Sequence, residues 1–125
     1  MNAEDRAKIE PEFNRALRLR DGGDWLGAAA IFEQLDVEHP NHPAILGVWG
    51  SIYFHLKDWQ RALPLYQRTV SLSPESELAS LGLFHSLWNV GKRKEALAEM
   101  KRFLSLKESE EYRQLIKEIG EEAKE

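Results

Sequence analysis

Residues 24–32 read DWLGAAAIF, and residues 58–66 read DWQRALPLY. Each stretch opens with Asp-Trp, carries Ala three residues after the Trp, and has a large apolar or aromatic residue four positions after that Ala. The chain contains only four Trp among 125 residues, so chance is a weak explanation for two such patterns. The two stretches therefore indicate that the sequence is internally repeated.

The repeat has a period of 34 residues and extends beyond these two stretches. Ala28 is followed at this spacing by Ala62 and Ala96, and Pro40 is followed by Pro74. A fixed period of roughly 20–50 residues is typical of an array whose units bury their apolar faces only against their neighbours. The period therefore predicts a repeat array.

Each unit is expected to consist of two helices joined by a short turn. In the second unit, Leu46, Trp49 and Tyr53 are spaced as one face of a helix. Pro43 suits the first turn of that helix. Asp58 is placed as the N-cap of the helix that follows.

These features resemble those of tetratricopeptide repeat (TPR) proteins. The family's 34-residue unit has a small residue in its first helix, followed by Tyr, Ala, an aromatic residue and a terminal Pro. The second unit of this chain carries the whole set, at Gly50, Tyr53, Ala62, Tyr66 and Pro74.

The resemblance implies an all-α solenoid in a single domain that spans residues 1–125. Its three helix-turn-helix repeats, six helices in total, are expected at about residues 9–42, 43–76 and 77–110. The third repeat departs from the pattern, with Phe84 at a position that is usually small and Glu108 at the position of the terminal Pro.

Other departures lie in the first two repeats. Glu12 and Arg15 occupy positions that the family buries, which indicates either a solvated outer face or a shifted register. Pro64 falls inside the second helix of the second repeat and predicts a local bend there. Residues 1–8 either extend the first helix as a frayed segment or precede a helix that Pro11 starts.

The final segment, SEEYRQLIKEIGEEAKE, predicts a seventh helix at residues 109–124. Ser109 is a good N-cap, and an apolar stripe lies opposite charged residues. This helix is expected to cap the last repeat, which is the usual role of a terminal helix in such arrays. A role as a partner-binding helix is the alternative. The stripe consists of Tyr112, Leu115, Ile116, Ile119 and Ala123.

Composition argues against several classes of function. The absence of Cys excludes disulfides, thiolate metal sites and cysteine nucleophiles. A net charge of −4, with Lys92-Arg93-Lys94 as the one basic cluster, argues against nucleic-acid binding. No apolar run has the length of a membrane span or a signal peptide, so a cytoplasmic protein without a membrane partner is expected.

The sequence gives little indication of catalysis or cofactor binding. It has no Gly-rich phosphate loop, no G-x-S-x-G and no HExxH motif, so an enzyme is not expected. His39 and His42 flank Pro40 in a turn and lack neighbouring metal ligands. His55 and His85 are interpreted as polar lining of a binding surface, with a paired proton switch or metal site as the alternative.

The resemblance implies a concave surface lined by the first helix of each repeat. Its aromatic anchors are expected to be Phe13, Phe54 and Trp88, with packing inside the solenoid as the alternative. The other implied positions include Asp21, Ala44, Gly47 and Leu78. The residues predicted to bind a partner are Phe13, Leu17, Arg20, Ser51, Phe54, His55, Leu81, His85, Trp88 and Asn89.

One TPR subclass clamps acidic chaperone C-termini with Lys and Asn at set groove positions. Here these positions are Phe13, Leu17, Val48, Leu78 and Gly82, so a carboxylate clamp is not expected. An apolar groove suits an amphipathic or hydrophobic protein segment. The resulting hypothesis is a bacterial protein-binding module, either a toxin-neutralising protein or a secretion chaperone. A self-assembling scaffold that forms homo-oligomers is the alternative.

Overall fold

The computed structural model describes the backbone of residues 2–124 and the side chains of residues 2–120. Over this part of the chain, the structure has seven α-helices and no strand, which confirms the all-α prediction. The helices are α1 (Ala3–Asp21), α2 (Trp25–Glu38), α3 (Pro43–His55), α4 (Trp59–Leu72), α5 (Glu77–Asn89), α6 (Arg93–Leu104) and α7 (Glu110–Lys124).

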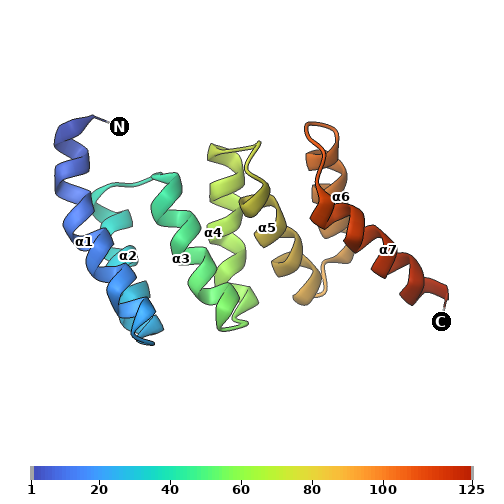
Figure 1. Cartoon of the computed structure of the whole chain (residues 1–125), viewed down its shortest axis with the longest axis horizontal. Coiled ribbons are helices and arrows are strands. Elements are labelled where there is room, and N and C mark those ends of the chain that lie inside the picture. Colours follow the sequence, from blue (N-terminus) through green and yellow to red (C-terminus); the bar gives the residue numbers. More distant parts are fainter. Residues whose placement is uncertain (1, 125) are drawn as a thin grey trace.

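The helices form an elongated solenoid with the two termini at opposite ends (Figure 1). From α1 to α6, each helix packs against the next one along the chain, and α3 also contacts α5. In the view of Figure 1, α1, α3, α5 and α7 lie on the near side, with α2, α4 and α6 behind them. This arrangement confirms the predicted solenoid of helix pairs.

The three turns within the helix pairs share one backbone conformation. Gly23, Lys57 and Gly91 have φ angles of 91°, 58° and 90°, in the left-handed region. The residue after each of them donates its backbone N–H to a carbonyl five positions earlier, over 2.8 Å in all three turns. Left-handed residues of this kind end helices by satisfying their last carbonyls, and Gly adopts the conformation at the lowest cost.

Asp side chains cap the helices that follow two of these turns. Asp24 accepts a hydrogen bond from the backbone N–H of Gly27 at 2.9 Å. Asp58 accepts one from the N–H of Arg61 at 3.2 Å, which confirms its predicted role as an N-cap. The repeated Asp-Trp pair is thus the start of a helix, and the Trp is its first residue.

Small residues at the predicted spacing form part of the core. Ala28, Ala62 and Ala96 are all fully buried. One apolar cluster gathers around Phe32 of α2, and a second around Phe84 of α5. Since an interior packed at crystal-like density leaves no spare volume, each of these alanines sets how closely neighbouring helices approach.

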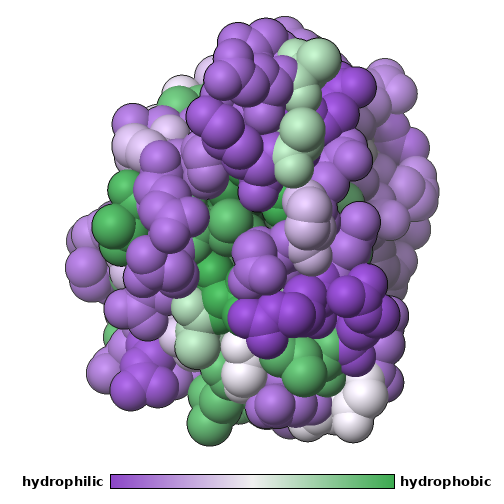
Figure 2. All heavy atoms as spheres, turned by 90° about the vertical axis from the view of Figure 1, so that its left-hand side faces the viewer, coloured by the Kyte–Doolittle hydropathy of each residue, from purple (hydrophilic) through white to green (hydrophobic). Residues whose placement is uncertain are grey.

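The outer face of α1 is solvated. Glu12 and Arg15 are both exposed and form an ion pair at 3.0 Å, which favours the first of the two interpretations above. Figure 2, which faces the α1 end of the solenoid, shows a mostly hydrophilic surface with hydrophobic atoms in the seams. The helix extends back to Ala3, so Pro11 lies inside α1 and does not start it.

Pro64 also lies within a helix. It is exposed on α4, which runs without interruption from Trp59 to Leu72. The bend expected at Pro64 stays a prediction. None of the helices in residues 2–124 combines the length and apolar character needed to cross a membrane.

A buried polar network connects α7 to the rest of the solenoid. Tyr112 is fully buried, and its hydroxyl lies 2.7 Å from Ser80 Oγ. Ser80 in turn donates to Glu99 Oε2 at 2.7 Å. Arg102 binds both oxygens of Glu99 and donates to the carbonyl of Pro74 at 2.9 Å.

The N-terminus of α7 is fixed by Ser109, as predicted. The buried Ser109 Oγ accepts the backbone N–H of Tyr112 at 3.1 Å. Leu115 and Ile119 pack, partly buried, on the second core cluster, whereas Ile116 is 47% exposed. The side chain of Ala123, the last member of the predicted stripe, lies outside the described side chains.

Candidate functional site

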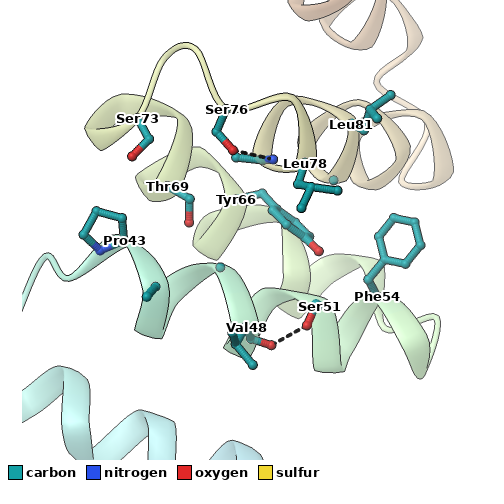
Figure 3. Close-up of a pocket in the computed structure, with 14 residues that line it drawn as sticks. Pro43, Val48, Ser51, Phe54, Tyr66, Thr69, Ser73, Ser76, Leu78 and Leu81 are labelled. Atoms are coloured by element: carbon teal, nitrogen blue, oxygen red, sulfur yellow. Dashed lines mark hydrogen bonds between the residues drawn. The ribbon is translucent and has the colours of Figure 1, made fainter. Parts of the chain in front are cut away.

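An apolar groove of about 550 Å³ lies between α3 and α5, with α4 as its floor (Figure 3). Residues from three consecutive helices surround it, and none of the described residues of α7 takes part. The described part of α7 therefore does not cover the groove. The lining consists of Pro43, Ala44, Gly47, Val48, Ser51, Phe54, Tyr66, Thr69, Ser73, Ser76, Leu78, Ala79, Leu81 and Gly82.

No lining residue of this groove carries a charge, although 30% of the chain is charged. Several of its hydroxyl groups already have partners in their own helices. Ser51 Oγ donates to the carbonyl of Val48 at 2.6 Å, and Thr69 Oγ1 donates to that of Leu65 at 2.7 Å. Ser76 Oγ accepts the N–H of Ala79 at 3.2 Å as the N-cap of α5. The groove thus presents mainly carbon to a ligand.

Tyr66 forms the floor of the groove. Its ring packs between Gly50 of α3 and Gly82 of α5. A Cβ at position 82 would collide with the ring, whereas a Cβ at position 50 would meet it at an ordinary contact distance of 3.4 Å. Burial raises the pKa of Tyr66 to about 12, so the phenol remains a protonated donor at neutral pH. In Figure 3 the hydroxyl points into the space between Leu78 and Phe54.

Small residues and one exposed leucine shape the walls. Gly47 faces open space, since a Cβ built there would meet only Thr69 Cγ2, at 3.9 Å. Leu78, on the opposite wall, is 81% exposed. An apolar side chain held this far out at the lip of an apolar groove can be buried by a ligand.

Three of the ten residues predicted to bind a partner line this groove, namely Ser51, Phe54 and Leu81. The implied positions Ala44, Gly47 and Leu78 line it as well. Phe54 also packs within the solenoid, with its ring edge-on to Trp59 at 4.9 Å and to Tyr66 at 6.3 Å. Phe54 therefore both lines the groove and packs within the solenoid, as the two interpretations of this residue proposed separately.

The predicted residues of α1 lie away from this groove. Phe13 packs edge-on against Phe32 at 5.2 Å, and Leu17 is half-buried against the same cluster. Arg20 pairs with Asp21 at 3.0 Å. For Phe13 and Leu17, the contacts are those of solenoid packing.

The two histidines on the first helices have different aromatic neighbours. His55 is exposed and stacks on Trp25, with ring centroids 3.8 Å apart. His85 is half-buried between Phe54 and Phe84, at 5.7 and 5.4 Å. Burial lowers the pKa of His85, and the charge of Glu118 on α7 partly opposes this shift.

Trp88 and Asn89 lie at the end of α5. The Trp88 ring stacks on Phe84 at 5.6 Å, and the Arg93 guanidinium lies 4.5 Å from its centroid. Asn89 is exposed and donates to the carbonyl of His85 at 2.7 Å. Both contacts hold these side chains to their own helix pair.

Sequence reasoning missed the floor of the groove. Tyr66 was identified as a repeat residue but not as a binding residue, and Thr69 and Ser73 were not selected. A signal was available in the small residues Gly47 and Gly82. Gly47 lies on α3 and Gly82 on α5, the first helices of two successive repeats. Small residues at these two positions leave part of α4, which lies between them, uncovered.

The described residues offer little to a metal ion. His39 and His42 border a separate hollow together with Asp5 and Glu38. Within residues 2–120, however, no group of three or more His, Asp or Glu side chains is placed to hold a metal.

Comparison with known proteins agrees with the fold. The tetratricopeptide repeat family matches residues 49–76, the stretch that contains Gly50, Ala62 and Tyr66. A search of curated protein sequences gives no significant match. Similar solved structures share 15–22% sequence identity with this chain, a level at which the likeness concerns the fold alone.

Three of these structures illustrate the range. The first TPR of Spaghetti, bound to an HSP90 peptide, has a TM-score of 0.78 at 18% identity, with 91% of each chain covered. MamA from Desulfovibrio magneticus has a TM-score of 0.68 at 22% identity, and the match covers 77% of this chain and 54% of that one. The Yersinia enterocolitica translocator chaperone SycD has a TM-score of 0.71 at 15% identity, with 96% and 92% covered.

The family match at residues 49–76 and the fold of the chain are together those of tetratricopeptide repeat proteins. The chain spans only about half of the length of the MamA chains it resembles.

Proposed function

We propose that this protein is a non-enzymatic binding module that holds an apolar segment of a partner protein in the groove between α3 and α5. The observation that carries the proposal is the charge-free lining of a 550 Å³ groove. Apolar concavities of this size with few polar groups are the usual sites of ligand binding. The exposed Leu78 gives the partner additional apolar area to bury.

The proposed partner is not an acidic peptide. The HSP90 peptide bound by the first TPR of Spaghetti, SRMEEVD, carries three carboxylate side chains. Here Val48, Leu78 and Gly82 occupy the corresponding clamp positions, and no Lys or Arg lines the groove. A buried carboxylate would lack a partner, which is costly.

Two biological roles fit such a groove in a bacterial cytoplasmic protein. A secretion chaperone would cover an aggregation-prone apolar segment, and the fold likeness to the translocator chaperone SycD supports this role. A toxin-neutralising protein would instead bind a folded effector. Self-assembly is a further candidate, since the SycD structure is described as a dimer.

The wider concave surface is proposed to contribute as well. Ser51, Phe54 and Leu81 would touch the bound segment directly, because they line the groove. The remaining predicted residues would form the flanking surface, with His55 and Asn89 exposed to reach a larger partner. These are Phe13, Leu17, Arg20, His55, His85, Trp88 and Asn89.

A filled groove tests the proposal. Gly47→Met places a side chain in the open space of the groove, and it raises helix propensity. Gly120→Met adds the same side chain to an exposed position of α7. A cellular protein captured by wild type and Gly120→Met but not by Gly47→Met is the expected result. Equal capture by wild type and both variants would show that the partner binds outside the groove. A molecular mass that rises with protein concentration would instead favour self-assembly.

A further inference from the structure

We infer that the groove between α3 and α5 takes its partner as an α-helix with an uncharged apolar face, and not as an extended strand. This inference rests on the proposed function, because it specifies the conformation of the segment that the groove holds. It follows from the hydrogen-bonding capacity of the lining and from its charge.

An extended peptide brings an unpaired N–H and C=O with every residue, and these groups need partners when they are buried. The groove has few to offer. Its walls and floor are α3, α4 and α5, whose backbone groups are bonded within the helices except in the first turns of α3 and α5 and the last turn of α4. Ser51 and Thr69 donate hydrogen bonds from their hydroxyl groups to carbonyls of their own helices.

Two lining hydroxyls, those of Tyr66 and Ser73, have no hydrogen bond within the described part of the chain. Tyr66 lies within α4 and Ser73 is the C-cap of that helix, seven residues further on. Two hydroxyl groups so far apart cannot pair with the successive N–H and C=O groups of an extended peptide. A bound helix satisfies its own backbone and presents only side chains. A hydrogen bond from Tyr66 could then select a single polar group on the apolar face.

Charge and shape lead to the same occupant. None of the fourteen lining residues is charged, so a charged side chain on the contacting face would be buried without a partner. Ala44 and Gly47 on the α3 wall leave room for close approach. The apolar side chains of such a helix would lie at i, i+3 or i+4, and i+7, which is the helix-in-groove pattern.

Two displayed peptide libraries test the inference against the full chain. The first randomises positions i, i+3, i+4 and i+7 with apolar residues in an Ala-rich helical host. The second carries the same randomised positions with Pro between them, so that its members are extended. Selected clones are then measured against wild type, Gly47→Met and Gly120→Met.

The expected result is a set of clones from the helical library whose affinity falls about tenfold or more with Gly47→Met and is unchanged with Gly120→Met. A central Pro in these clones should abolish binding. Clones that depend on the groove and come only, or with equal affinity, from the extended library would overturn the inference and leave the proposed function standing. No groove-dependent clone from either library would overturn the proposed function as well.

Discussion

Gly82 of α5 lies in direct contact with the ring of Tyr66 of α4, so closely that a Cβ at position 82 would collide with the ring. We predict that Gly82→Ala displaces Tyr66 and lowers the free energy of unfolding by about 1–3 kcal/mol. Urea unfolding measures this change. Gly47→Ala is the matched control, because its Cβ enters open space, and it should leave stability unchanged or raise it by up to about 1 kcal/mol.

The turn at Lys57 allows a stabilising substitution. Lys57 has a φ of 58° where the equivalent turns have glycine. A non-glycine residue in this conformation costs about 1 kcal/mol, so Lys57→Gly should raise the free energy of unfolding by up to that amount. Gly91→Ala should lower it by a similar amount. A destabilised Lys57→Gly variant would show that the lysine side chain contributes more than its backbone costs.

Tyr112 anchors α7, and its two contributions can be separated. Tyr112→Phe removes the hydroxyl bonded to Ser80, while Ser80 still donates to Glu99, so a loss of about 1 kcal/mol is expected. Tyr112→Ala also empties a fully buried site and should cost about 3–5 kcal/mol. Hydrogen exchange of α7 should accelerate more in the Ala variant. Equal exchange in both would mean that the hydroxyl alone holds the helix.

The ion pair between Asp36 of α2 and Arg68 of α4 connects successive helix pairs. Both Arg68 Nη atoms lie 2.9 Å from the carboxylate oxygens, and the Asp36 side chain is only 17% exposed. A double-mutant cycle should give a coupling energy of about 1 kcal/mol. The exposed Glu12–Arg15 pair is the control, and a smaller coupling energy is expected there because solvent screens both charges. A larger coupling for the control would contradict this ranking.

His85 should make stability depend on pH. Burial between aromatic rings lowers its pKa below 6.5 in the folded state, so the unfolded state binds the proton more readily. The His85 contribution is thus fully present above pH 6.5 and is lost as the pH falls below it. Denaturant unfolding between about pH 7.5 and pH 5.5 should show a smaller decline for His85→Gln than for wild type.

The charge of Glu118 provides the control for this experiment. Glu118 partly opposes the lowering of the His85 pKa, so Glu118→Gln should steepen the decline towards low pH. A double variant should decline as His85→Gln does. If Glu118→Gln has the same effect in both backgrounds, then its charge acts on groups other than His85.

Sequence alone predicted those parts of the fold that depend on local patterns. Asp58 and Ser109 are helix caps because a cap requires only a side chain and the N–H three residues later. Ala28, Ala62 and Ala96 are buried because the period places them at the same helix crossing. The groove positions Ala44 and Gly47 followed from the family resemblance.

The rest depends on contacts that no local pattern reveals. Phe13 and Phe54 are both aromatic residues of a first helix, but Phe13 packs against Phe32 whereas Phe54 lines the groove. Whether such an aromatic side chain packs inside the solenoid or lines the groove depends on how closely its helix approaches the neighbouring helices. The contact between Ser80 and Tyr112 joins residues 32 positions apart in different helices. Neither residue carries a signal for the other.

The buried network around Tyr112 has a consequence for rearranging the protein. One period before Ser80 and Glu99 stand Leu46 and Leu65, both buried and both apolar. The second unit thus has hydrocarbon at the two positions where the third has a hydroxyl and a carboxylate. A third unit moved inward by recombination would need a tyrosine at the position of Tyr112 in the helix after it. The units share a fold but are not interchangeable. The polar side chains of the third unit fit α7, and the apolar side chains at the same positions of the second unit do not, so these contacts determine the order of the units.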